Sequence, residues 1–178
     1  MFNFSLTNQI ILLAILLIVS AFFSISETSL MSVSRYRLKH LAKSGNAGAK
    51  LATKLLKETD KLLSVILLCN NFSNAAAATL VTIIAVQLYG DQQFIIMVGT
   101  LITTFLILIF SEISPKVIAA AHPEKLALSC SFLLYPLLKI LYPIVLFVNI
   151  FVLGILKIFN IKINFNQNNL ITMDELKS

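Results

Sequence analysis

The spacing of charged residues constrains this chain more than any other feature of its sequence. No charged residue precedes Glu27, and none lies between Lys61 and Asp91. The next charged residue after Asp91 is Glu112. Because an α-helix rises about 1.5 Å per residue, roughly 20 consecutive apolar residues are needed to cross a bilayer. The charge-free stretches therefore predict three membrane-spanning helices. They cover residues 8–32, 62–88 and 93–116.

The composition agrees with a chain that lies in lipid. Hydrophobic residues make up 58% of it and charged residues 12%, and the mean hydropathy is +0.90. A soluble domain has about 45–50% apolar and about 25% charged residues. We therefore expect an all-α membrane protein with one membrane domain over residues 1–160, whose excess apolar surface contacts the lipid bilayer.

A basic segment at residues 35–61 separates the first two predicted spans. It holds eight lysines and arginines and two acidic residues, Glu58 and Asp60. The resulting charge of +6 equals the net charge of the whole chain. Such an excess in a short loop is typical of the cytoplasmic side, which places the N-terminus outside and the C-terminus in the cytoplasm. We prefer this interpretation to nucleic-acid binding. Leucines at helical spacing, interrupted at residues 44–46, predict two short amphipathic helices at the membrane surface.

The apolar stretch at about residues 121–158 is interrupted by Lys139, with Pro136 and Pro143 on either side. Lysines both before and after the stretch indicate that its two ends lie on the cytoplasmic side. We therefore favour a juxtamembrane belt or a kinked hairpin over a fourth span. Residues 161–178 predict a linker followed by a helix start at Thr172, which would lead into cytoplasmic modules beyond these 178 residues.

Polar residues occur inside the first two predicted spans. Ser20 and Ser24 are four residues apart and share one helix face. They could also hydrogen-bond to their own helix or allow close helix packing. Asn70 and Asn71 are adjacent in the second span, with Asn74 one turn further on. Four alanines follow at residues 75–78, which suggests either tight interhelical packing or a local unwinding.

Glu112 is the ionisable residue of the third predicted span, and such a residue indicates a functional site by default. Pro115 frees the carbonyl of Ser111 from the helix. The alternative role for Glu112 is an ion pair with Lys116 at the helix end. Two serine hydroxyls, asparagine oxygens and one carboxylate form an all-oxygen set, which hard cations such as Mg²⁺ prefer. One charge among neutral ligands suits weak, reversible binding.

Four stretches make the sequence resemble the membrane domain of the CNNM/CorC family of magnesium transporters, the DUF21 domain. They are SAFFSISET at residues 20–28, LLSVILLCNN at 62–71, SEISPK at 111–116 and AHPE at 121–124. The resemblance implies three spans with a cytoplasmic belt, a homodimer in the inner or plasma membrane, and outward transport of Mg²⁺ by alternating access, coupled to Na⁺. It implies a metal site made of Ser20, Ser24, Asn70, Asn71 and Glu112.

The resemblance also implies paired cytoplasmic CBS modules that bind ATP, and these do not lie within the 178 residues. Asn74 is a candidate for a sodium site or for helix packing. Two positions depart from the family pattern, because Cys69 and Ser111 stand where glycine is common. A Mg²⁺-sensing module that does not transport ions is the alternative function. We expect no enzyme, because the spans contain neither paired aspartates nor an HExxH motif.

Overall fold

The structure, a computed structural model, describes residues 5–90 and 92–158, with side chains for 5–90, 92–144 and 147. Asp91, which lies between the second and third predicted spans, and the tail expected over 161–178 are outside the described residues. The chain forms two compact units, Met1–Tyr142 and Pro143–Ser178. All contacts discussed below belong to the first unit, and what is described of the second is helical as far as Ile158.

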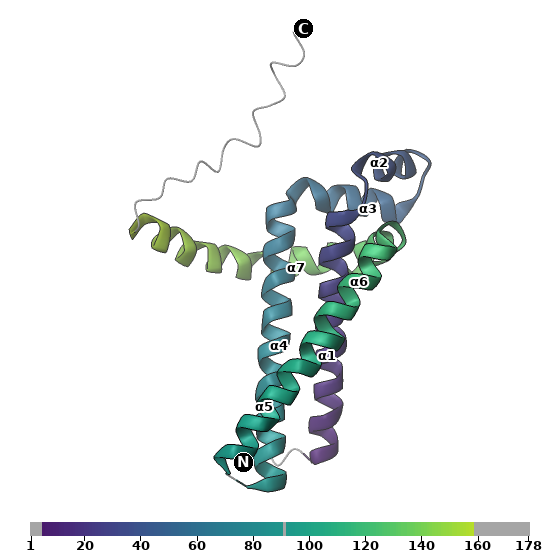
Figure 1. The fold of residues 1–178 in the computed structure, drawn as a ribbon. Helices are drawn as coiled ribbons and strands as arrows, with labels where there is room; N and C mark the ends of the chain where they lie inside the picture. Colours follow the sequence, from purple (N-terminus) through teal and green to yellow (C-terminus); the bar gives the residue numbers. More distant parts are fainter. Residues whose placement is uncertain (1–4, 91, 159–178) are drawn as a thin grey trace. The chain divides into compact units, whose positions relative to one another are not determined.

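Every regular element in the described residues is helical, which confirms the all-α class (Figure 1). The elements are α1 (Leu6–Ser32), α2 (Arg35–Lys43), α3 (Ala47–Leu55), η1 (Leu56–Glu58), α4 (Thr59–Tyr89), α5 (Gln93–Ile107), the π-helical turn η2 (Leu108–Ile113), α6 (Ser114–Ala121) and α7 (Pro123–Ile158).

The three predicted spans correspond to α1, α4 and the continuous run α5–η2–α6. α1 packs mainly on α4, and also on η2 and α6, while α4 packs on α5. By length and hydropathy, four helical stretches of the described chain could cross a membrane, and the fourth is Pro123–Ile144 in α7. This stretch is apolar enough to span, so its contacts with the rest of the unit are informative.

The basic segment forms the two short helices that its leucines predict. Ser34 caps α2 by accepting a hydrogen bond from the Arg37 N–H, and Asn46 caps α3 by accepting one from the Ala49 N–H. Such N-caps satisfy backbone donors that the first helical turn leaves free. Between the helices Gly45 has φ of +98°, a conformation that glycine adopts without steric cost.

The first half of α7 runs alongside this basic segment. Near its start Glu124 pairs with Arg37 at 2.6 Å, and further on Leu128 and Phe132 pack closely on Gly48. Residues further along α7 therefore contact residues further along the basic segment, so the two run in the same direction. We interpret this arrangement as the predicted belt. α7 is helical from Pro123 to Ile158, and the choice between a belt and a kinked hairpin stays a prediction.

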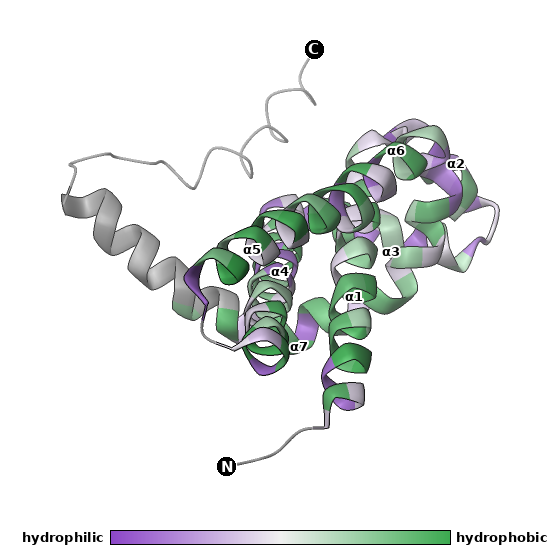
Figure 2. Cartoon of the chain, turned by 60° about the horizontal axis from the view of Figure 1, so that its bottom comes forward, coloured by the Kyte–Doolittle hydropathy of each residue, from purple (hydrophilic) through white to green (hydrophobic). Residues whose placement is uncertain are grey.

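The apolar core lies where α1, α2, α3, α4 and α7 meet. Leu30, Leu38, Leu62 and Leu134 are each almost completely buried within it. Burying such a side chain stabilises a fold by about 1.5–3 kcal/mol. Elsewhere α1 and α5 consist mainly of hydrophobic residues (Figure 2), and many of their large apolar side chains are exposed. Exposed apolar area of that extent is typical of contact with lipid.

Candidate functional site

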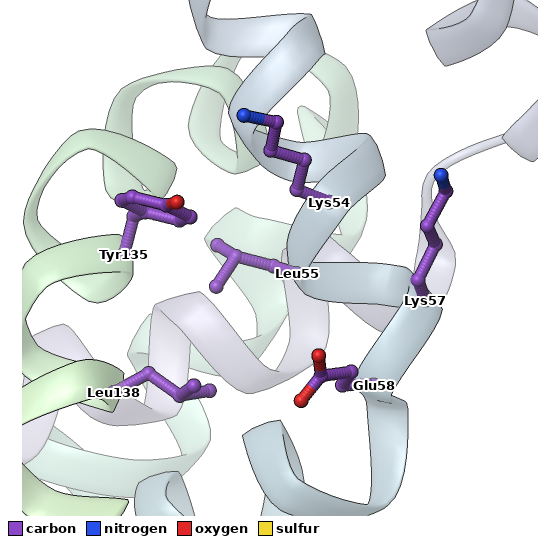
Figure 3. A pocket seen from close by; sticks show the side chains of 6 residues that line it. All are labelled: Lys54, Leu55, Lys57, Glu58, Tyr135 and Leu138. Carbon is purple, nitrogen blue, oxygen red and sulfur yellow. The ribbon is translucent and has the colours of Figure 1, made fainter.

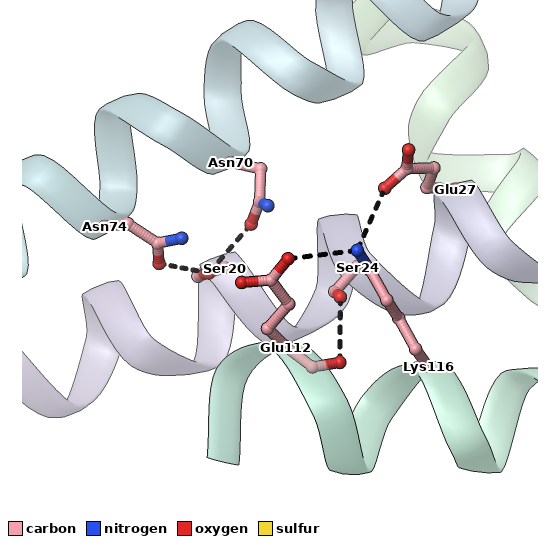
Figure 4. Close-up of polar contacts among 7 residues, drawn as sticks. All are labelled: Ser20, Ser24, Glu27, Asn70, Asn74, Glu112 and Lys116. Atoms are coloured by element: carbon pink, nitrogen blue, oxygen red, sulfur yellow. Dashed lines mark hydrogen bonds and ion pairs between the residues drawn. The ribbon is translucent and has the colours of Figure 1, made fainter. Parts of the chain in front are cut away.

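The two serines of α1 bond to other helices. Ser20 Oγ lies within hydrogen-bond distance of the Oδ1 atoms of Asn70 and Asn74 on α4, and Ser24 Oγ donates to the backbone carbonyl of Glu112 at 3.3 Å (Figure 4). Both serines are buried. Ser26, in contrast, bonds back to its own helix. Back-bonding within α1 therefore does not account for Ser20 and Ser24, which join α1 to the other two spans.

The asparagines of α4 divide by helix face. Asn70 and Asn74 are four residues apart and both reach Ser20, whereas the side chain of Asn71, about 100° further round the helix, is exposed. The structure therefore brings Asn70 and Asn74 into the cluster and leaves the Asn71 side chain outside it. α4 is a continuous helix through these residues, so the expected alternative of a local unwinding is wrong.

Three side-chain oxygens converge at Ser20. Its Oγ lies 2.8 Å from Asn70 Oδ1 and 2.6 Å from Asn74 Oδ1. A hydroxyl has one hydrogen, so with the amides oriented this way it can donate to only one of these carbonyl oxygens at a time. No hydrogen then lies between the Ser20 oxygen and the second carbonyl oxygen. A cation placed beside these oxygens would be stabilised by all three, because hard cations take neutral oxygen ligands.

The third span changes its helical form where it meets this cluster. Residues 108–113 form the π-helical turn η2, and the N–H of Ser114 bonds to the carbonyl five residues earlier, that of Ile109. Pro115 follows directly. Its ring crowds the preceding turn and it lacks an N–H, so a wider turn before it relieves the clash. The buried Ser111 donates from this turn to the Leu17 carbonyl of α1 at 3.3 Å.

Glu112 extends from the π-helical turn and pairs with a lysine. Lys116 Nζ lies 3.1 Å from Glu112 Oε1 and 3.9 Å from Glu27 Oε2 of α1. The three side chains are between 24% and 38% exposed, so water reaches the group. In the view of Figure 4 the other carboxylate oxygen of Glu112 points toward Ser20. One ammonium group therefore lies between two carboxylates, which leaves a net charge of −1 beside the oxygen cluster.

Most of the predicted site residues lie together. Ser20, Ser24, Asn70 and Glu112 come from three different helices, and Asn74 is part of the same cluster. Sequence reasoning missed Glu27, which lies three residues after Ser24 and so shares its face of α1. It also treated Asn70 and Asn71 as equivalent, although helical periodicity separates them. Among the described residues, no group of three or more His, Cys, Asp and Glu side chains could hold a metal.

The apolar helices and the polar cluster between them define a multi-pass helical membrane protein. Residues 11–178 match the family described as the cyclin M transmembrane N-terminal domain. The chain belongs to this family, as its motifs predict.

Relatives in bacteria and plants support the assignment. A UPF0053 protein of Haemophilus influenzae is 46% identical over 97% of the chain, and the UPF0053 inner membrane protein YfjD of Escherichia coli is 42% identical over 90%. A chloroplastic DUF21 domain-containing protein of Arabidopsis thaliana is 32% identical over 97%. The chain covers 40%, 37% and 26% of these proteins' lengths, so it corresponds to a part of each.

Proposed function

We propose that this chain is the membrane core of a Mg²⁺ transporter that exports the ion by alternating access. The observation that carries the proposal is the convergence of Ser20, Asn70 and Asn74 oxygens between α1 and α4, beside the Glu112 carboxylate of the third span. Neutral oxygens with one or two carboxylates suit Mg²⁺, which usually keeps several of its waters. The ion is the transported substrate.

The position of the cluster supports movement of the ion. Its ligands come from three helices, so a shift of one helix against another would open the site to one side and close it to the other. The π-helical turn at Glu112 is a local irregularity of a kind that occurs often at functional sites. Coupling to Na⁺ belongs to the same proposal. Asn74 contacts Ser20 directly, so a sodium ion bound at Asn74 would share ligands with Mg²⁺ and compete with it.

The wider assembly is also part of the proposal. We place the N-terminus outside and the basic segment inside the cell, in a multi-pass cell membrane protein that forms a homodimer. ATP would act only through CBS modules outside these 178 residues. The alternative function is a Mg²⁺-sensing module that binds the ion at the same oxygens and does not move it. The two functions share their binding chemistry, and an enzyme is not proposed.

Binding of Mg²⁺ to the purified protein, measured by calorimetry, tests the site. We expect saturable binding that is lost in Glu112→Ala and weakened in Ser20→Ala. Ser26→Ala is the matched control, because this buried serine of α1 donates to the Phe22 carbonyl of its own helix and is not part of the oxygen cluster. Equal binding by all four proteins would refute the site. Mg²⁺ flux in reconstituted vesicles, with and without a Na⁺ gradient, then separates the transporter from the sensor.

A further inference from the structure

A groove lies between residues 135–142 of α7 and residues 54–61 at the end of the basic segment. One hollow of about 290 Å³ is lined by Lys54, Leu55, Lys57, Glu58, Tyr135 and Leu138. A second, of about 250 Å³, shares three of these residues and continues to Lys61, Lys139 and Tyr142. We call the two hollows together the belt groove. It lies away from the oxygen cluster, and the proposed transport of Mg²⁺ does not use it.

The belt groove is strongly cationic. Four lysines line it against one acidic residue, Glu58, whose carboxylate is held by Lys61 at 2.8 Å. The net charge of its lining is therefore +3. Two of the lysines reach across to α7, since Lys54 Nζ lies 5.8 Å from the ring centre of Tyr135 and Lys61 Nζ lies 4.8 Å from that of Tyr142. These cation–π contacts hold ammonium groups within the groove.

The inner wall of the groove is apolar. Leu55 is buried at its base and Leu138 is half-buried opposite (Figure 3). In this view Tyr135 and Leu138 face Leu55, whereas Lys57 points away. α7 also exposes large apolar side chains such as Ile140, which is 68% exposed. A cationic rim over an apolar wall matches a molecule with an anionic head and an apolar tail.

We infer that the belt groove binds the phosphate headgroup of an anionic phospholipid. Lysine and tyrosine are the residue types that mark the boundary between water and lipid, and juxtamembrane lysine clusters attract anionic headgroups. The phosphate would lie between Lys54 and Lys139, one on each wall of the groove. The acyl chains would follow the apolar surface of α7 into the bilayer. The bound lipid would thereby hold α7 against the basic segment.

The test measures lipid binding to the purified protein in neutral detergent. Dioleoyl phosphatidylglycerol is added, and dioleoyl phosphatidylcholine and inorganic phosphate are the comparison ligands. Bound lipid is counted by native mass spectrometry, and the thermal midpoint is measured in parallel, because a ligand that binds the folded state raises it. We expect phosphatidylglycerol alone to bind and to stabilise the parent protein.

Two double variants decide whether the groove is the site. Lys54→Gln with Lys139→Gln removes one lysine from each wall, and Lys39→Gln with Lys43→Gln removes the same charge from exposed positions of α2. The groove variant should bind phosphatidylglycerol about 25-fold more weakly, because each lysine beside an anionic lipid contributes about fivefold. The α2 variant should bind like the parent.

Three results would overturn the inference. Equal losses in the two variants would mean that the whole basic segment attracts anionic lipid without a defined site. Equal binding of phosphatidylcholine would mean that the headgroup charge is not recognised. Equal stabilisation by inorganic phosphate would mean that the lipid chains contribute nothing and that the ligand is free phosphate.

Discussion

Replacing Lys116 should strengthen Mg²⁺ binding if Glu112 is a ligand. The Lys116 ammonium lies 3.1 Å from Glu112 Oε1, where it neutralises the carboxylate that the incoming cation needs. A divalent cation must therefore displace the ammonium or bind beside it. Lys116→Gln removes this competition and keeps a polar side chain of similar length.

The size of the effect follows from the exposure of the pair. At about 4 Å, two unit charges interact by about 1 kcal/mol in water and about 4 kcal/mol at an effective dielectric constant of 20. The side chains of Lys116 and Glu112 are 38% and 33% exposed, so solvent screens the pair and the lower value applies. A loss of about 1 kcal/mol of competition corresponds to roughly fivefold tighter binding of Mg²⁺.

Calorimetry on the parent protein and matched variants measures this difference. Lys116→Arg keeps the positive charge and should bind Mg²⁺ like the parent. Lys125→Gln removes an exposed charge of α7 and controls for the change in net charge. Unchanged binding in Lys116→Gln would refute the competition, and weaker binding would show that Lys116 positions Glu112 for the ion. Loss of binding in every protein, the parent included, would refute the proposed site itself.

A double-mutant cycle examines how Glu27 takes part. Glu27 Oε2 lies 3.9 Å from Lys116 Nζ and offers the ammonium a second acceptor when Mg²⁺ occupies Glu112. Glu27→Gln should therefore weaken Mg²⁺ binding in the parent protein. The same change should have little effect in the Lys116→Gln background, because the interaction it removes is already gone. Strictly additive effects would show that Glu27 acts on the ion without Lys116.

Further predictions concern the site and the packing of α7. Asn74→Ala should weaken Mg²⁺ binding by roughly tenfold, because one partly buried polar partner is worth about 1–2 kcal/mol, whereas Asn71→Ala should leave the binding unchanged. Calorimetry on both variants compares two faces of α4. Gly48→Ala should lower the thermal midpoint, because the new Cβ would lie 2.9 Å from a backbone carbonyl oxygen of α7, and an unchanged midpoint would contradict this packing. Leu134→Ala should destabilise by about 2–5 kcal/mol and the adjacent, exposed Leu133→Ala by less than about 0.5 kcal/mol, and similar unfolding midpoints for the two would contradict the described orientation of α7.

The sequence by itself determined the positions of the helices. Within lipid, an apolar stretch of this chain can satisfy its backbone polar groups only by forming a helix. The charge-free stretches that end at Glu27, Asp91 and Glu112 therefore located the spans. The break at Gly45 was likewise local, because polar residues there interrupt the leucine spacing of the basic segment. The family motifs identified Ser20, Ser24, Asn70 and Glu112, which the structure brings close together.

Only the tertiary structure decided which polar groups meet. Helical geometry gave Asn70 and Asn74 a common face, but only the packing of α4 on α1 showed that this face meets Ser20. The interhelical hydrogen bonds of the cluster join residues between 50 and 94 positions apart in the chain. Local periodicity fixes the face on which a side chain lies. The helix that it contacts depends on how whole helices pack, and in this protein that packing also placed Lys116 between two carboxylates.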